Sequence, residues 1–197
     1  MSYVARRTEG TAGAPLFLTF HGTGGDETQF HGLAETLVPG AFVTSPRGDV
    51  SEAGALRYFR RTGEGVYDMD DLAERTEAMA GFIRTEKERT AGSRVIGLGY
   101  SNGANILMAV ALAHPDLVDD LILLHPLIPW SPDPQPGLDG RRVLITAGER
   151  DPICPAPMTT ALEGYLVRQG AEVTTHWQPG GHQIVESEIG AVRNFLS

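Results

Sequence analysis

Cysteine is almost absent from this sequence, and so are long hydrophobic runs. The single cysteine, Cys154, excludes an intrachain disulfide framework, which fits a reducing compartment without requiring one. Residues 1–7 lead into polar residues and glycines and lack the apolar core of a signal peptide. The longest apolar helical stretch, residues 106–113, is too short to cross a bilayer. These absences predict a cytoplasmic protein with no membrane insertion.

Basic residues are also scarce. The formal net charge is −9, and the short basic clusters are the arginine pairs at positions 6–7, 60–61 and 141–142. Binding to nucleic acid requires clustered Lys and Arg, so no nucleic-acid partner is expected, and the pairs are better explained as solvated or ion-paired residues. No H-E-x-x-H motif or paired Cys/His spacing indicates a metal, and we expect no cofactor.

What the sequence does contain is an alternation of short apolar runs and helical patterns across one domain of 197 residues. The runs predict strands at residues 16–20, 41–44, 94–99, 121–124, 142–147 and, nearer an edge, 172–177. Helical spacing predicts helices at residues 70–88, 102–113, 158–169 and 184–195. Strands that alternate with helices predict an α/β fold, with a mostly parallel central sheet covered by helices on both faces.

Two long segments break this alternation. Residues 46–69 contain four glycines, and residues 126–140 contain five prolines. Both follow the carboxyl end of a predicted strand, which is the edge where open α/β sheets bind ligands. Loops of this length in a compact domain are usually functional or disordered.

The most specific motif is G-x-S-x-G, from Gly99 to Gly103, with Ser101 at its centre. It stands directly after a predicted buried strand and at the start of a predicted helix, where the nucleophile turn of an α/β-hydrolase belongs. The tight turn needs neighbours without side chains, and it lifts the hydroxyl toward the free N–H groups of the helix N-terminus. The motif therefore predicts Ser101 as a nucleophile rather than part of a plain Gly-rich turn.

A serine nucleophile needs a base and an acid that orients the base, and in this fold they follow in the order Ser, acid, His. Asp151 lies in a turn after the strand at 142–147, and His182 follows Gly180-Gly181 after the last strand. Asp151 is therefore the predicted acid and His182 the predicted base, with Glu149 as the alternative acid. The other histidines are weaker candidates, among them His125, which does not follow an acid in this order.

Two backbone N–H groups should hold the oxyanion. One is that of Asn102, the residue after the nucleophile. The other comes from the loop after the first buried strand, where we choose Thr23. His21, in the same loop, is expected to hydrogen-bond nearby backbone rather than to transfer protons.

With these residues in place, the sequence resembles the phospholipase/carboxylesterase family of small α/β-hydrolases, and within it the bacterial MhqD-like carboxylesterases. The stretches that carry the resemblance are residues 20–27, 47–48, 57–61, 64–68, 99–105, 148–153 and 180–182. The resemblance implies hydrolysis of carboxylic esters without metal or organic cofactor, by the same triad and the same oxyanion donors. Relatives often dimerise, so the resemblance leaves a homodimer open. It does not name the substrate.

The two long segments should form the pocket walls. The residues offered for contact with substrate are Tyr58, Phe59, Leu127, Ile128 and Trp130. Three arginines, Arg57, Arg60 and Arg61, would bind a substrate carboxylate or, as we favour, pair with Glu64 or Asp68. No helical lid is predicted, which favours small or medium esters as substrates.

Other functions are open at this stage. The same triad would serve an acyl thioesterase or a lysophospholipase. A non-catalytic ligand-binding protein on a hydrolase scaffold would keep the pocket without the chemistry. A dinucleotide site at Gly97-Leu98-Gly99 is disfavoured because Asn102 stands where the third glycine of G-x-G-x-x-G is needed.

Overall fold

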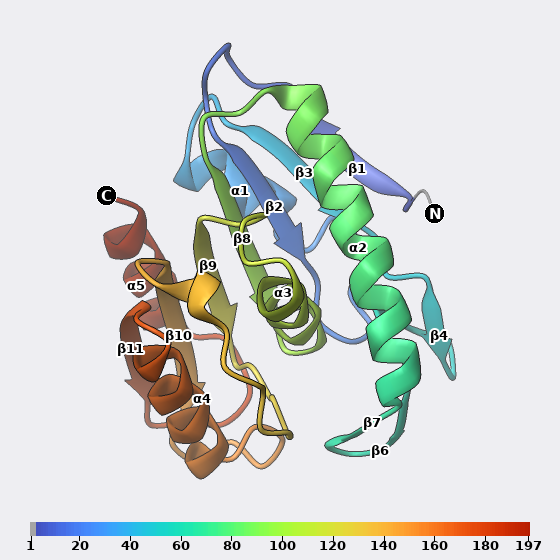
Figure 1. The fold of residues 1–197 in the computed structure, drawn as a ribbon, viewed down its shortest axis with the longest axis vertical. Coiled ribbons are helices and arrows are strands. Elements are labelled where there is room, and N and C mark those ends of the chain that lie inside the picture. The colour runs from blue at the N-terminus through green and yellow to red at the C-terminus, as the bar shows by residue number, and fades with distance from the viewer. Residues whose placement is uncertain (1–2) are drawn as a thin grey trace.

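The computed structural model describes residues 3–197 and is built on a seven-stranded sheet (Figure 1). The strand order is β1-β3-β2-β8-β9-β10-β11, and all neighbours are parallel except β1 and β3. The bounds are β1 Ala5–Thr8, β2 Leu16–Phe20, β3 Phe42–Pro46, β8 Val95–Tyr100, β9 Asp120–Leu124, β10 Arg142–Gly148 and β11 Glu172–Gln178. The predicted mostly parallel α/β sheet is confirmed, and the carboxyl ends of its six parallel strands share one edge.

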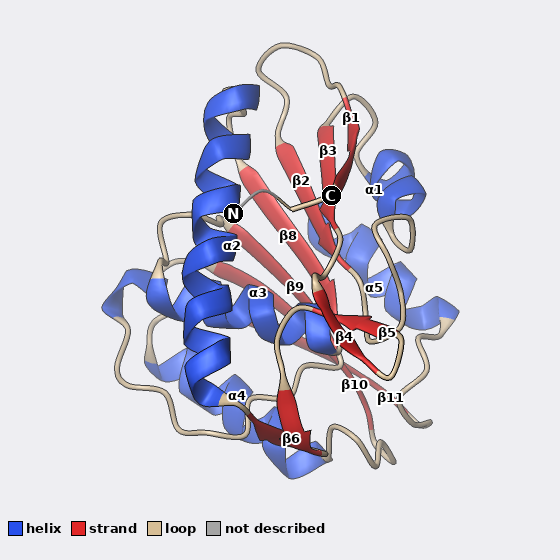
Figure 2. Cartoon of the chain, turned by 90° about the vertical axis from the view of Figure 1, so that its right-hand side faces the viewer, coloured by secondary structure: helices blue, strands red, loops and turns tan. Residues whose placement is uncertain are grey.

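Helices cover both faces of this sheet (Figure 2). One face carries α2 (Met69–Thr90), α3 (Asn102–Ala113) and α4 (Ala156–Arg168), and the other carries α1 (His31–Leu37) and α5 (Glu186–Leu196). Alternation along the strands divides the core accordingly: Leu121 and Leu123 of β9 pack on the first face, and Ile122 and Leu124 on the second.

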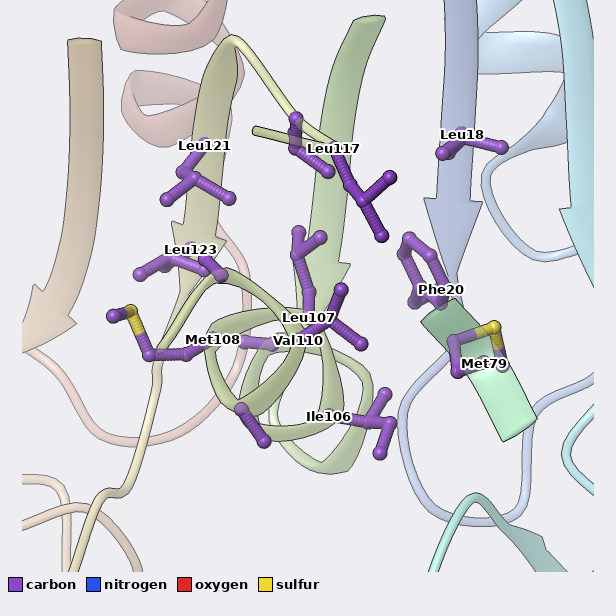
Figure 3. Packing of buried hydrophobic residues seen from close by; sticks show 14 of the residues in the cluster. Leu18, Phe20, Met79, Ile106, Leu107, Met108, Val110, Leu117, Leu121 and Leu123 are labelled. Atoms are coloured by element: carbon purple, nitrogen blue, oxygen red, sulfur yellow. The ribbon is translucent and has the colours of Figure 1, made fainter. Parts of the chain in front are cut away.

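Helix α3 lies at the centre of the larger core, on the sheet and beside α2 (Figure 3). Its residues from Asn102 to Ala111 are all buried, which explains why the segment is apolar on every side. Leu107 and Val110 pack with Leu117 and Leu121, while Ile106 lies toward Met79 of α2. The helix that carries the predicted nucleophile at its N-terminus is thus fixed by packing over its whole length.

Some elements were not predicted. Strand β1 has the sequence Ala-Arg-Arg-Thr, which lacks an apolar pattern, and it pairs antiparallel at the edge of the sheet. Helix α1 is only seven residues long. The segment 46–69 contains two hairpins, β4 (Val50–Glu52) with β5 (Ala55–Arg57) and β6 (Arg61–Gly63) with β7 (Val66–Tyr67). The segment 126–140 stays irregular apart from one 3₁₀ turn, η1 (Pro136–Leu138).

Within residues 3–197, no helix is both long enough and apolar enough to cross a bilayer.

Candidate active site

Ser101 occupies a strained turn between β8 and α3. Its φ is 51° and its ψ is −117°, a region that non-glycine residues rarely adopt. The flanking glycines are required by close backbone approaches: a Cβ at Gly99 would lie 2.5 Å from the Gly103 oxygen, and a Cβ at Gly103 would lie 2.4 Å from the Phe20 oxygen. The contact between Gly103 and Phe20 also places the end of β2 against the N-terminus of α3.

The structure brings Ser101, His182 and Asp151 together from three separate segments. The His182 Nε2 atom lies 3.0 Å from the Ser101 Oγ, and the His182 Nδ1 atom lies 2.7 Å from Oδ2 of Asp151. The Asp151 side chain is fully buried, whereas that of His182 is 15% exposed. This is the hydrogen-bonded order that a serine nucleophile, a base and an orienting acid need.

Backbone contacts fix the loop that carries Asp151 against the loop that carries His182. A Cβ at Gly148, before the Asp151 turn, would lie 2.2 Å from the Gly181 oxygen, so only glycine lets these two loops meet. The Arg150 N–H donates to the Gly180 oxygen at 2.9 Å. On the other side, the Tyr100 hydroxyl donates to the His182 carbonyl at 2.8 Å. The histidine is therefore carried on a loop attached both to its acid and to the residue before the serine.

Asp151 stays ionised although it is buried. Burial alone would raise its pKa, but hydrogen bonds from the Cys154 N–H, from His182, from His125 and from the Ile153 N–H together lower the pKa below its ordinary value. The two backbone N–H groups donate to Oδ1 at 3.0 and 2.8 Å, which leaves Oδ2 for the imidazoles. The carboxylate is thus able to stabilise a positive charge on His182.

The two predicted oxyanion donors lie at the same cavity. Asn102 begins helix α3, where the first N–H groups have no acceptor within the helix. Thr23 lies in the loop after β2, and its hydroxyl accepts a hydrogen bond from Arg57 at 2.9 Å. Both residues line the cavity that also contains Ser101 and His182. His21 contacts backbone atoms as expected, with Nδ1 near the Gly22 oxygen and Nε2 accepting from the Gly48 N–H.

The cavity beside Ser101 has a volume of about 260 Å³ and a mixed polar and apolar wall. Of the five pocket residues predicted, only Leu127 lines it. Tyr58, Phe59 and Ile128 are buried in the core, and Trp130 lines two other hollows of the surface. The prediction is corrected here because the hairpins of segment 46–69 turn the aromatic rings of Tyr58 and Phe59 inward. Tyr67 and Asn105, which were not predicted, stand in the wall instead.

The three arginines of this segment have different surroundings. Arg57 and Arg61 line the cavity, and both pair with Glu52, at 3.3 and 3.0 Å. Arg61 also pairs with Glu64 at 2.6 Å. Arg60 points away from the cavity and pairs with Asp68 and Asp71. Arg60 and Arg61 therefore pair with the predicted partners Asp68 and Glu64, whereas Arg57 pairs with Glu52, which was not predicted.

The other candidates for the acid, the nucleophile and the base are less suited to these roles. Glu149 is exposed to solvent. Cys154 lines the cavity, but burial raises the pKa of its thiol, so it is a poor nucleophile near neutral pH. His176 is bonded to Ser187 at 3.2 Å, and His114 to Glu77 at 2.8 Å.

Sequence reasoning set aside one residue that contacts the site, His125. Its Nδ1 lies 2.9 Å from the same Asp151 oxygen that holds His182, and its Nε2 lies 2.8 Å from Glu188. The signal that could have found it is its position directly after β9, at the same sheet edge as the other site residues. The chain order Ser, acid, His cannot identify a histidine that contacts the acid but precedes it in the sequence.

Among residues 3–197, one group of metal-ligating side chains lies close together, and it consists of His125, Asp151 and His182. Each imidazole is already hydrogen-bonded to Oδ2 of Asp151, at 2.9 and 2.7 Å. A metal would have to displace both hydrogen bonds at an aspartate that is fully buried. The donor set fits a buried acid between two imidazoles better than it fits a metal centre.

Comparison with known proteins agrees with this geometry. The chain is 38% identical over 182 residues to the putative hydrolase MhqD of Bacillus subtilis, and the match covers 91% of each protein. The chain belongs to the MhqD-like hydrolases. It has the α/β-hydrolase fold of the carboxylesterases, as the sequence resemblance implied. A model of the Ndr family also matches residues 43–130.

Solved structures of other proteins extend this comparison for the MhqD-like chain. The protein Atu2452 of unknown function from Agrobacterium tumefaciens superposes with a TM-score of 0.93 at 56% identity, over 98% of this chain and 95% of that one. The Bacillus cereus carboxylesterase superposes with a TM-score of 0.91 at 33% identity, over 98% and 93%. The B. subtilis hydrolase and the B. cereus carboxylesterase support an enzyme, specifically a hydrolase of the carboxylesterase type.

Proposed function

We propose that this MhqD-like hydrolase is a serine carboxylesterase that cleaves small to medium esters through an acyl-enzyme on Ser101. One observation carries the proposal: the Ser101 Oγ lies 3.0 Å from His182 Nε2, while His182 Nδ1 lies 2.7 Å from the buried Asp151 carboxylate. The names of the B. subtilis hydrolase and the B. cereus carboxylesterase support the reaction class.

The reaction has two steps. In the first, His182 takes the Ser101 proton while Oγ attacks the ester carbonyl, and the Thr23 and Asn102 N–H groups hold the oxyanion. The carbon–oxygen bond to the alcohol then breaks, and His182 gives the alcohol its proton. In the second step, His182 takes a proton from water, which attacks the acyl-enzyme. The acid leaves as Ser101 regains its proton from His182.

Cavity size and wall chemistry limit the substrate. A volume of about 260 Å³ is at the small end of ligand pockets, and charged groups from Arg57, Arg61 and Glu64 stand in its wall. A long alkyl chain would have to lie along these charges or extend into solvent. Short acyl groups, with or without polar substituents, suit the site better.

We expect p-nitrophenyl acetate and butyrate to be hydrolysed with a kcat/KM at least tenfold higher than the palmitate ester, since the cavity accepts only short chains. The measurement is a chain-length series at one pH with detergent held constant. A thioester and a lactone series run beside it would distinguish the same triad acting as an acyl thioesterase. Equal or higher kcat/KM on the palmitate ester would contradict the size argument.

Covalent labelling distinguishes the enzyme from a binding protein on the same scaffold. A fluorophosphonate should modify the protein with one equivalent, and peptide mapping should place the adduct on Ser101. Both labelling and hydrolysis should fail together if the scaffold only binds ligands.

A further inference from the structure

Behind the proposed triad, a second histidine and a second carboxylate continue the hydrogen-bond chain. Oδ2 of Asp151 lies between two imidazoles, His182 Nδ1 at 2.7 Å and His125 Nδ1 at 2.9 Å. The other nitrogen of His125 lies 2.8 Å from Oε1 of Glu188 on helix α5. The side chains of His125, Asp151 and Glu188 are all fully buried.

The protons in this chain follow from its geometry. Each ring nitrogen of His125 faces a carboxylate oxygen, and a neutral imidazole has only one N–H. Both contacts are satisfied together when His125 is an imidazolium, or when it is neutral and one of the two carboxyl groups carries the proton. Although burial alone would lower its pKa, the hydrogen bonds to Glu188 and Asp151 raise it above its ordinary value. Burial opposes ionisation of Glu188, but its bonds from His125, Thr146 and Val185 lower its pKa.

The backbone around His125 also fixes the position of this residue. Its φ is 50°, a left-handed conformation that costs energy in a residue with a side chain. Its N–H donates to the Thr146 oxygen at 2.9 Å, and its oxygen accepts from the Cys154 thiol at 3.2 Å. Glu188 is fixed too, since it accepts from Thr146 Oγ1 at 2.6 Å and from the Val185 N–H at 2.8 Å.

We propose that Glu188 and His125 are positioning residues for the reaction, with Glu188 holding His125 as a cation that orients Asp151 and offsets part of its charge. The inference rests on the proposed serine mechanism. Its consequence falls on His182, whose ring centroid lies 5.2 Å from that of His125. A cation this close adds to the charge that surrounds the base, so the pH dependence of the reaction is the readout that its loss should change.

The groups that face His125 come from every element around it. They are Asp151 from the loop after β10, Thr146 from β10, Glu188 from α5, His182 from the loop before α5, and Tyr100 from β8, whose ring centroid lies 6.0 Å away. Burial raises the pKa of Tyr100 to about 12, so this phenol stays neutral and adds no charge near neutral pH. The two carboxylates and the two imidazoles therefore set the local charge.

Glu188→Gln tests the proposal because it keeps the shape and the three contacts of the side chain, with the bonds to Thr146 and His125 reversed in direction. The amide oxygen would accept from Val185, and the amide NH₂ would donate to Thr146 Oγ1 and to the freed Nε2 of a neutral His125. Only the charges of Glu188 and of His125 would be lost. In the hydrogen-bond chain His125 lies between Asp151 and Glu188, so the lost cation stands closer to the base along the chain than the lost anion does. The proposal therefore predicts that protonation of the base is favoured in the variant.

We expect the acid limb of the kcat/KM–pH profile to move up by about one pH unit in Glu188→Gln. At a pH below both limbs kcat/KM would fall about tenfold, while above them it would change by less than about threefold. The matched control is Glu186→Gln on the same helix, whose side chain is 84% exposed and which should leave the profile unchanged. An unmoved acid limb, a shift to lower pH, or an equal loss of activity at all pH values would overturn the proposal.

A second measurement needs no variant. With ¹⁵N-labelled histidine, the wild-type protein should show one imidazole with both ring nitrogens protonated at pH 8, and this signal should disappear in Glu188→Gln. A neutral His125 at pH 8 would overturn the proposal even if the variant did not fold. Failure of the serine mechanism would be seen separately, as a wild-type protein that neither hydrolyses esters nor takes a fluorophosphonate.

Discussion

Replacing Ser101 by alanine is expected to lower kcat for ester hydrolysis by about 10⁵-fold, the scale of loss that follows removal of a triad nucleophile. The histidine, the acid and the oxyanion donors would remain but would have no oxygen to activate. The measurement is hydrolysis of p-nitrophenyl acetate with stoichiometric labelling as a parallel readout. Activity within tenfold of the wild type, in a protein that is folded and free of contaminating esterase, would refute the nucleophile.

A glycine at the same position separates catalysis from stability. Ser101 has a φ of 51° and a ψ of −117°, and such strain costs about 1–3 kcal/mol in a residue with a side chain. Ser101→Gly should therefore be as inactive as the alanine variant, yet gain about 1 kcal/mol, seen as a melting temperature about 2–4 °C higher. Ser101→Ala keeps the strained backbone and is the matched control. A glycine variant less stable than the alanine variant would show that the turn stores no strain.

Gly103→Ala is expected to damage both the fold and the reaction. The added Cβ would lie 2.4 Å from the Phe20 oxygen and 2.5 Å from the His21 oxygen, so helix α3 and the end of β2 must separate. Because Asn102 begins the helix and Thr23 follows β2, the two oxyanion donors would move apart. Loss of one such donor lowers kcat by about 10²–10³-fold, and overpacking costs about 1–3 kcal/mol.

Thermal melting and steady-state kinetics would measure both effects of Gly103→Ala. Gly81 offers a matched control, since it lies within helix α2 and a Cβ there would meet no atom within 4 Å. Gly81→Ala should stabilise the protein by up to about 1 kcal/mol and leave kcat unchanged. A Gly103→Ala variant with wild-type kcat would mean that the two donors do not depend on this close approach.

The parts of the site predicted from sequence are those governed by local or topological rules. In the G-x-S-x-G motif, Gly99 is required by a contact inside the motif, with the Gly103 oxygen. Gly103 is required by the topology, because its neighbours are the Phe20 and His21 oxygens at the end of β2. Asp151 and His182 follow from topology, since the carboxyl ends of parallel strands meet at one edge of the sheet. The same two rules place Asn102 and Thr23 at the cavity, and their role as oxyanion donors stays a prediction.

The parts that sequence reasoning missed depend on the paths of irregular segments. Tyr58 and Phe59 were expected in the pocket wall, but the hairpin folding of segment 46–69 buries both rings. Strand β1 was not predicted because a strand at the edge of a sheet can pair without an alternation of apolar residues. The contact between His125 and Glu188 was not predicted because the two residues are 63 positions apart, one directly after strand β9 and the other on helix α5.

Strand β11 lies at the border of the sheet, so the residues of the site are divided between this border and the middle of the sheet. Strand β11 has only β10 beside it, and the loop and helix that follow it carry His182 and Glu188. Ser101 belongs instead to the middle of the sheet, between β8 and the fully packed α3. Border elements open more easily than central ones. Partial unfolding would therefore detach His182 and Glu188 first, while Ser101 would remain on the folded core.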